Sequence, residues 1–370
     1  MEAAKIALQG CTPDALVEAF PDLAPGEARR VHSHVMKGRK LSDTIVQVRR
    51  GPLESVRTRG DVPSLEVVAH EKSQLDPFEK WMLRTPDGEV IETVRIPLEK
   101  EGRFSVCVST QVGCAMACTF CATGRLGLRR NLEVWEIVEQ VRLVRASLPE
   151  GSRIHGVVFQ GMGEPLANYD RVVQAIRVFS QSSGLAIDGR NVTVCTSGNP
   201  GAIRKLAGDA PNARLGISIA SALSESRKKL MPIENVFALR DVLDAAAFHA
   251  EKTAMSPMFA LTLLAGVNDS EEDARAFAGL FQGFHAATGR RPRVSIIPYN
   301  SIGASDPYVR TSDEREEAFR AILLSQGVPT HKRYSGGGDV SAACGQLAAL
   351  GATGNVGTFR SPKSTIGEIR

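Results

Sequence analysis

Six short apolar runs, rich in β-formers and ending in Gly- or Ser-containing loops, dominate the sequence after about residue 88. They cover residues 103–109, 153–160, 191–195, 214–220, 257–264 and 293–299. Amphipathic stretches separate them, and the strongest helical pattern covers 131–148. Strands that alternate with helices favour a parallel sheet, so we predict an α/β fold, open or curled into a barrel. In such folds the chemistry gathers at the C-terminal ends of the strands.

The N-terminal part of the chain has a different pattern. Residues 1–80 show no clear strand alternation, and two short helices are indicated at 12–20 and 24–38, each opened by a proline signal. A chain of 370 residues is long enough for one large domain and a smaller one. We therefore expect a helical domain over 1–85, a barrel over 86–350 and a flexible tail over 351–370.

The charge of the chain is uneven. The net charge is only +4, but residues 29–60 carry nine basic side chains against Asp43 and Glu54. The basic residues are Arg29, Arg30, Lys37, Arg39, Lys40, Arg49, Arg50, Arg57 and Arg59. A basic segment on a nearly neutral body predicts a phosphate-binding surface, although a solvated helix face would have the same composition.

The amino-acid composition indicates the cellular compartment in which the protein works. The chain is 43% hydrophobic and 23% charged, as in ordinary globular proteins. No apolar run approaches the roughly 18 residues of a membrane helix, and the N-terminus lacks the pattern of a signal peptide. We expect a cytoplasmic protein with no membrane partner, in which thiols stay reduced. The seven cysteines are odd in number and clustered, which suits metal binding or catalysis better than structural bridges.

Three of these cysteines, Cys114, Cys118 and Cys121, form a C-x₃-C-x₂-C array. They are too close for a disulfide framework and one short of a closed four-ligand zinc site, and residues 123–125 add no fourth ligand. A [4Fe–4S] cluster held by only three thiolates leaves one iron open to the amine and carboxylate of a methionine moiety. We predict one such cluster, with S-adenosylmethionine (SAM) on the open iron. The alternatives are a small zinc site or three cysteines that bind no common ligand.

Candidate ligands for SAM lie in the loops that follow the predicted strands. In "GMGEP" (161–165) a glycine lets the backbone approach a ligand, and the carboxylate that follows is suited to binding an ammonium group. Hydroxyl and amide groups at other strand ends are suited to binding carboxylate, ribose or adenine. The predicted set is Gly163, Glu164, Cys195, Ser197, Ser218 and Asn300. Each of these taken singly is more often an ordinary loop residue.

Six motifs together resemble one family. They are "IETVRIP" (91–97), "CVSTQVGCAMACTFCATG" (107–124), "GMGEPLANYD" (161–170), "VTVCTSGNP" (192–200), "IIPYN" (296–300) and "DVSAACGQL" (339–347). Their order and content resemble the radical-SAM RNA adenine methyltransferases (the RlmN/Cfr family) over roughly residues 85–350. The resemblance implies a partial (β/α)6 radical-SAM barrel that methylates a ring carbon of an adenosine in ribosomal or transfer RNA.

The resemblance also implies roles for residues outside the array. Cys344 would take a methyl group from one SAM, a radical from a second SAM would remove hydrogen from it, and the methylene would add to adenine. Cys107 would form a disulfide with Cys344 and release the product, and Glu92 would remove the ring proton. Arg125, Arg129, Arg130 and the "SRKK" of 226–229 would hold RNA phosphates. The implied partners are RNA and an electron donor such as flavodoxin, and the implied oligomeric state is a monomer.

This chain departs from the family at three places. Ala220 stands where the family usually has His, Cys195 where it has Ser, and residues 259–269 replace an acidic and aromatic stretch. These departures leave open which RNA and which adenine carbon are modified. They motivate one alternative, the same mechanism on a small-molecule substrate. A non-catalytic iron–sulfur RNA-binding protein is a further alternative, but it leaves Cys107, Cys344 and Glu92 without a purpose.

Overall fold

A computed structural model describes residues 5–38, 40–303 and 306–348. The tail expected over 351–370 lies outside the described residues. Within the described part, no helix combines the length and the apolar character needed to cross a membrane.

A ten-stranded sheet organises the described residues, in the order β14-β13-β12-β11-β10-β9-β6-β5-β4-β3. Its parallel strands are β6 (Arg103–Cys107), β9 (Arg153–Phe159), β10 (Val192–Thr196), β11 (Arg214–Ser218), β12 (Met258–Thr262), β13 (Arg293–Ile297) and β14 (Thr330–Lys332). Each of the six predicted apolar runs therefore contains a strand. Because every parallel pair joins neighbours in this order, the carboxyl ends of these strands lie along one edge.

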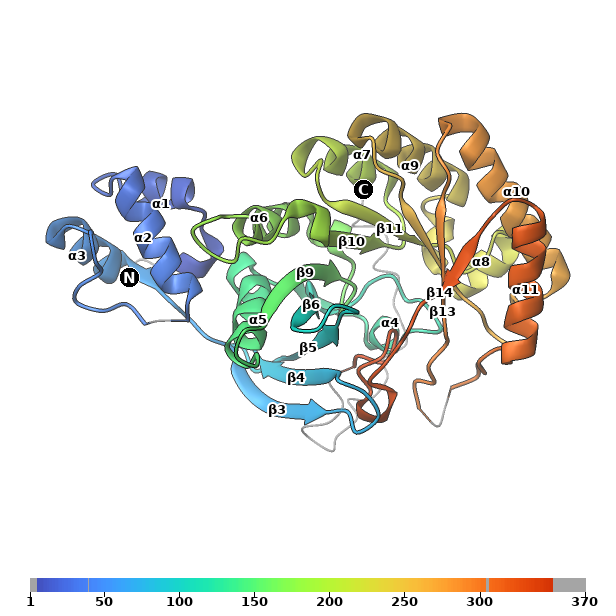
Figure 1. Ribbon diagram of the computed structural model, residues 1–370, viewed down its shortest axis with the longest axis horizontal. Coiled ribbons are helices and arrows are strands. Elements are labelled where there is room, and N and C mark those ends of the chain that lie inside the picture. The colour runs from blue at the N-terminus through green and yellow to red at the C-terminus, as the bar shows by residue number, and fades with distance from the viewer. Residues whose placement is uncertain (1–4, 39, 304–305, 349–370) are drawn as a thin grey trace.

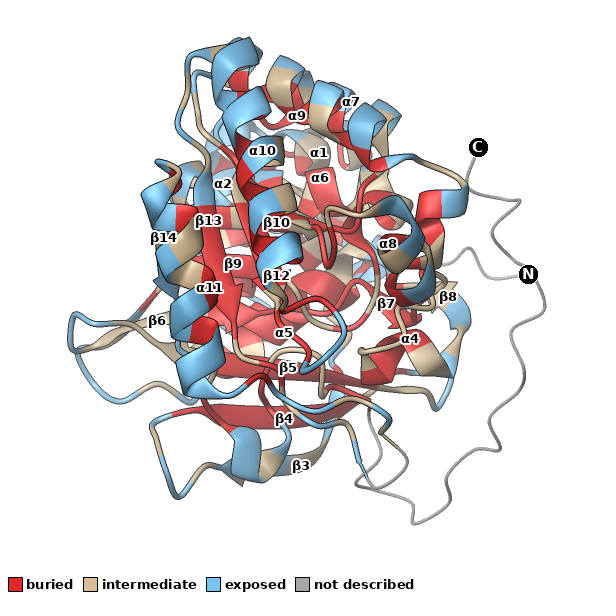
Figure 2. Cartoon of the chain, turned by 90° about the vertical axis from the view of Figure 1, so that its right-hand side faces the viewer, coloured by how far each residue is buried: buried red, intermediate tan, exposed pale blue. Residues whose placement is uncertain are grey.

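Helices follow these strands and cover the sheet (Figure 1). They are α4 (Ala122–Leu126), α5 (Val134–Ala146), α6 (Tyr169–Phe179), α7 (Pro200–Asp209), α8 (Ser224–Leu230), α9 (Leu239–Thr253), α10 (Glu271–Thr288) and α11 (Asp313–Ser325). Each long helix turns an apolar face to the strands, so buried residues gather on the strands and on the inner helix faces (Figure 2). The predicted α/β architecture with repeated β/α units is confirmed.

Three antiparallel strands extend the sheet beyond β6. They are β3 (Glu66–Lys72), β4 (Glu79–Arg84) and β5 (Val90–Pro97). The helical domain expected over 1–85 therefore also contains strands that show no clear alternation in the sequence, and the boundary placed at residue 85 falls in the turn between β4 and β5. The sequence of β4 does not show the alternation expected of a strand. Both of its faces are buried, and its Glu79 and Lys80 are buried in ion pairs.

The two helices predicted near the N-terminus are present. The segment contains β1 (Ile6–Ala7), η1 (Leu8–Gly10), α1 (Pro13–Ala19), α2 (Pro25–Met36), α3 (Arg50–Arg59) and β2 (Gly60–Asp61). Thr12 caps α1 by accepting a hydrogen bond from the Ala15 amide at 3.2 Å, and prolines open both α1 and α2. The three helices lie together at one end of the molecule, where η1 packs against α5 and α6 (Figure 1).

Candidate active site

A cavity lies at the carboxyl ends of the parallel strands. Its volume is about 950 Å³, counting the space open to solvent. Successive strands each contribute to its wall, through Gln160 after β9, Cys195 on β10, Ser218 on β11, Thr262 on β12 and Ile297 on β13. The chemistry is therefore expected where the parallel fold concentrates it.

The three clustered cysteines line this cavity. Their loop lies between β7 (Gln111–Gly113) and β8 (Leu128–Asn131), two short strands that pair antiparallel. Helix α4 presses directly on the loop, because a Cβ at Gly124 would lie 2.8 Å from the carbonyl oxygen of Cys118. Only glycine fits there, so the tight path of the loop is encoded in the sequence.

Burial dominates the electrostatics of the three thiols. It raises the pKa of Cys114, Cys118 and Cys121, and neighbouring thiols raise the first two further. Without a cation the thiols stay protonated, and a positively charged group would have to hold them as thiolates. Among the described residues, no three His, Cys, Asp or Glu side chains lie close enough to hold a single metal ion. The three soft sulfur donors fit an iron–sulfur group with one open position.

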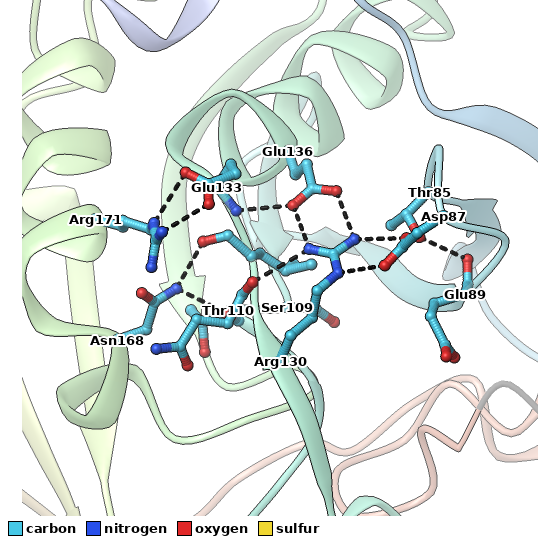
Figure 3. A network of polar contacts seen from close by, with 12 residues as sticks. Thr85, Asp87, Glu89, Ser109, Thr110, Arg130, Glu133, Glu136, Asn168 and Arg171 are labelled. Atoms are coloured by element: carbon cyan, nitrogen blue, oxygen red, sulfur yellow. Dashed lines mark hydrogen bonds and ion pairs between the residues drawn. The ribbon is translucent and has the colours of Figure 1, made fainter.

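A polar network fixes the base of the cysteine loop (Figure 3). The Arg130 guanidinium on β8 bonds Asp87 from the β4–β5 turn at 2.6 Å and both carboxylate oxygens of Glu136 on α5 at 2.8 and 2.9 Å. Glu136 also accepts from the Glu133 amide at 2.7 Å, which caps the start of α5. Hydrogen bonding to Arg130 holds the pKa of Asp87 well below its usual range.

This pairing corrects part of the phosphate-binding prediction. Arg130 is bonded on both of its edges, and Arg129 pairs with Glu89 at 2.6 Å. Arg227, within the "SRKK" segment, is fully buried and bonds Glu234 at 2.5 Å and the carbonyl oxygen of Ser197 at 3.0 Å. Arg227 therefore braces the site from within and the guanidinium of Arg130 is taken up by carboxylates, whereas the side chain of Arg129 is 63% exposed beside Glu89.

Glu164 and Ser197 form one unit at the cavity wall. Glu164 accepts from the Ser197 amide at 2.9 Å and from its hydroxyl at 2.8 Å. Burial raises the pKa of the carboxyl, and the Ser197 hydrogen bonds oppose that rise. Neighbouring Gly163 has φ +102°, and a Cβ there would lie 2.6 Å from the Cβ of Gln111. Gly163 and Glu164 of the "GMGEP" loop thus both line the cavity, and the close backbone contact of Gly163 is with Gln111.

The other predicted SAM ligands separate into two groups. Ser218 and Cys195 line the cavity beside Glu164. Asn300 is not part of the cavity wall, and its amide donates to the carbonyl oxygen of Cys344 at 3.2 Å and to the Ser335 hydroxyl at 3.0 Å. The structure therefore gives Asn300 a contact with the Cys344 segment.

Cys344 faces the same cavity as the clustered cysteines. Its segment runs beside α4, where the Ala122 amide donates to the carbonyl oxygen of Gly345 at 2.8 Å. Gln346 donates to the carbonyl oxygen of Ser301 at 2.9 Å. In Figure 1 this last segment (red) passes close to α4 and the edge of the antiparallel strands. The Cys344 segment, near the C-terminal end of the described residues, therefore packs against the cysteine loop.

Cys107 and Cys344 are both free thiols, as are the other five cysteines, so the predicted disulfide is not formed in this structure. Cys107 ends β6 and is buried without lining the cavity. Burial raises the pKa of its thiol, and the Cys344 thiol raises it further, as expected for groups that lie near each other.

Glu92 lies on β5, the strand next to the one that carries Cys107. It is buried outside the cavity wall. One carboxylate oxygen accepts from the Ala348 amide at 2.7 Å, and the other lies 3.3 Å from the ammonium of Lys80. Glu92 therefore contacts the end of the Cys344 segment. Lys80 was missed by the sequence analysis because no motif marks it.

The comparisons with known proteins agree with this geometry. The model of the radical SAM superfamily matches residues 108–278, which contain the cysteine loop and the strands up to β12. A crystal structure of a radical SAM methyltransferase from Sphaerobacter thermophilus superposes with a TM-score of 0.83 and 33% identity. The superposition covers 93% of the present chain and 99% of the Sphaerobacter chain.

Curated relatives match over most of their length. A probable RNA methyltransferase of Sorangium cellulosum is 51% identical over 344 residues, 87% of each chain. A dual-specificity RNA methyltransferase RlmN of an Anaeromyxobacter species is 38% identical and covers 90% of this chain and 87% of its own. A probable dual-specificity RNA methyltransferase RlmN of Clostridioides difficile is 34% identical and covers 94% and 98%.

Proposed function

We propose a function from the premise that the chain belongs to the radical-SAM RNA methyltransferase family (RlmN/Cfr). The chain is an RNA methyltransferase with a radical mechanism, and the names of its relatives favour RNA over a small-molecule substrate. Its target is a ring carbon of an adenosine in ribosomal or transfer RNA. One observation carries this proposal: the three-cysteine loop and Cys344 open to one cavity.

The cofactor set consists of one [4Fe–4S] cluster and SAM. Cys114, Cys118 and Cys121 hold the cluster, which when bound supplies the electron that cleaves SAM to a carbon radical. Glu164, fixed by Ser197, binds the methionine ammonium, and Ser218 offers a hydroxyl to the rest of the molecule.

Cys344 carries the methyl group that becomes the new carbon on adenine. It is the cavity thiol on a loop, and a residue that meets both the cofactor and the RNA base has to be accessible from the cavity. Cys107 then attacks the sulfur of Cys344 and releases the methylated base, because its buried thiol lies near that of Cys344.

Glu92 removes the ring proton from the adduct. Its carboxylate contacts Ala348, four residues after Cys344, so it is near the segment that carries the adduct. Glu92→Gln keeps an oxygen that can accept from the Ala348 amide. We therefore expect this variant to fold and to cleave SAM while its yield of methyladenosine falls. A yield equal to that of the parent would remove Glu92 from the mechanism.

Residues 1–85 serve as the accessory region that binds RNA, through basic side chains of the helical segment. Among the described residues, seven of them are exposed: Arg29, Arg30, Lys37, Lys40, Arg49, Arg50 and Arg59. Because cations that bind phosphates release counterions, RNA affinity should fall steeply with salt, and Arg29→Ala/Arg30→Ala should flatten that dependence. We further propose that the protein is a cytoplasmic monomer reduced by a small electron carrier such as flavodoxin.

The direct test is anaerobic incubation of the reconstituted protein with SAM, a reductant and unmodified ribosomal or transfer RNA. Mass spectrometry of the nucleosides should find adenosine methylated on a ring carbon, and Cys344→Ala should yield none. Methylation of a ring nitrogen, or activity that Cys344→Ala retains, would contradict the proposal.

A further inference from the structure

We propose that Cys195 is a second resolving thiol, able to form a disulfide with Cys344 in place of Cys107. This inference rests on the proposed function and deepens it. Cys195 is the position at which the chain departs from the serine usual in the family, so the route would belong to chains with this cysteine. It follows from where the topology puts three free thiols: Cys195 and Cys344 line the cavity, and Cys107 is buried at the end of β6.

The sheet order keeps the two candidate partners of Cys344 apart. Cys107 ends β6 and Cys195 lies on β10, with β9 between them. In register, Cys107 faces Val158 of β9, and Val194 faces Phe159. Neighbouring strands are about 4.8 Å apart, so these two backbones are about 9–10 Å apart, beyond the roughly 7 Å that a disulfide spans. The backbone spacing therefore disfavours a bond between Cys107 and Cys195, although the Cys195 thiol raises the pKa of Cys107 as the Cys344 thiol does. Each of the two is a candidate partner of Cys344, whose thiol raises the pKa of both.

Cys344 is the thiol that can reach either one. It lies on a loop, and within the described residues its own backbone is tied through the Asn300 amide at 3.2 Å. Cys195 and Cys344 both line the cavity, whereas Cys107 does not. The Cys195 sulfur has only a weak contact, 3.9 Å from the side-chain oxygen of Gln160. Cys195 is thus the more accessible partner from the cavity side.

A fixed cation stands beside this pair. Burial raises the pKa of Cys195 to about 12, the Arg333 guanidinium opposes that rise, and the Cys344 thiol adds to it. Arg333 is held in place by its hydrogen bond to Gln160 at 3.2 Å. A guanidinium near a thiol stabilises the thiolate, which is the attacking form. Arg333 opposes the pKa rise of Cys107 as well, so it favours the thiolate of either candidate partner of Cys344.

The chemical step is a thiolate attack on sulfur. Cys195 loses its proton, and its sulfur attacks the sulfur of the Cys344 thioether, so that an S–S bond forms. The bond from the Cys344 sulfur to the methylene carbon breaks, and its electron pair stays on that carbon, which takes a proton and becomes the methyl group. The two cysteines are left oxidised as a disulfide, and a dithiol reductant returns them to thiols.

The first test maps disulfides without RNA. Trypsin cuts Cys195 and Cys344 into separate peptides, 191–204 and 334–360, each with no other cysteine, so a link between them is unambiguous. Holoprotein carrying Cys107→Ala is treated with a stoichiometric thiol oxidant such as diamide, denatured, alkylated and digested. We expect these peptides to be linked in most molecules, and the link to vanish when Cys195→Ser is added. Cys11→Ser, in the N-terminal segment, is the matched control and should change nothing.

The second test follows RNA bound covalently to protein from cells. Cys107→Ala should retain some RNA, and Cys107→Ala/Cys195→Ser should retain several-fold more, because both release routes are then closed. Equal retention in the two variants, with no link between the two peptides, would overturn the inference while the proposed function stands. Absence of RNA from both variants would contradict the proposed release chemistry itself. Should the double variant fail to fold, the oxidised Cys107→Ala holoprotein alone decides: peptides 191–204 and 334–360 must be found linked, and their absence as a linked pair overturns the inference.

Discussion

The cavity is built by two cysteine-bearing segments that are held in different ways. The cysteine loop, residues 113–127, is fixed at its base by the ionic network of Arg130. The Cys344 segment is held by single hydrogen bonds, at Asn300, Ala122 and Glu92. The Arg130 network joins groups of opposite charge, whereas the bonds at Asn300 and Ala122 join neutral groups and the bond at Glu92 joins a carboxylate to a neutral amide, so the first set is the stronger.

The difference matches the two kinds of chemistry in the proposal. A cluster has to stay in place, since its ligands need a fixed geometry. A methyl-carrying thiol has to meet SAM, then adenine, then a resolving thiol, so its segment needs some freedom. The comparison predicts that damage to the first segment removes the cofactor, and damage to the second changes the reactivity of Cys344.

The largest effect is expected from removing a cluster ligand. Cys118→Ala should abolish both iron binding and SAM cleavage, because two thiolates cannot hold the cluster in place. Iron analysis after anaerobic reconstitution measures this directly, with Cys11→Ala as the matched control. Full iron content in Cys118→Ala would mean that the cysteine loop is not the cluster site.

The next effect comes from the base of that loop. Arg130→Ala leaves the buried Glu136 carboxylate without its strongest partner, and the lost charged hydrogen bond should cost about 1.5–3 kcal/mol of unfolding free energy. Arg129→Ala removes only the more exposed pair with Glu89, worth about 0.2–1 kcal/mol. Urea unfolding of the apoprotein compares the two, and similar losses would show that the network does not brace the loop.

A smaller effect is expected in the Cys344 segment. Asn300→Ala removes the amide that donates to the carbonyl oxygen of Cys344, at a cost of about 1 kcal/mol. Alkylation of Cys344 by iodoacetamide should become faster, while iron content stays that of the parent. Unchanged alkylation together with lost iron would reverse the comparison, because Asn300 would then belong to the cofactor site.

The smallest effect is a pH dependence. The folded-state pKa of Asp87 is depressed by Arg130, so its contribution to stability is complete above its usual pKa of about 4 and is lost as the pH falls below that value. Between about pH 4 and pH 2 the parent should lose more stability than Arg130→Ala. Equal losses in the two proteins, by urea unfolding, would contradict this assignment.

The sequence allowed most of the fold to be predicted where apolar patterning was clear. Six of the seven parallel strands lie in the predicted apolar runs, and their loops carry the cysteine motif and "GMGEP". The short β14 (Thr330–Lys332) was not predicted. Strand β4 was not predicted from the sequence, because its Lys80 is buried against Glu71 and Glu92 on other strands. Such pairs depend on contacts that a linear pattern does not contain.

The same limit applies to the site. The cavity residues Cys114, Glu164, Ser197 and Cys344 were found from motifs, since each motif has a chemical purpose. Arg130 and Arg227 were assigned to RNA because charge alone does not reveal a partner. Their carboxylates, Glu136 and Glu234, lie only six and seven residues away, a spacing that suggests local pairing but does not prove it.

The most direct test of the account follows the methyl hydrogens of SAM. With a trideuterated methyl group, a radical route through Cys344 removes one deuterium before the carbon reaches adenine and restores one hydrogen from solvent. The methyladenosine formed in water should therefore carry two deuterium atoms, and 5′-deoxyadenosine should carry one. Mass spectrometry reads both products from one anaerobic reaction. A methyl group that arrives on adenosine with all three deuterium atoms would show direct transfer from SAM and would contradict the account.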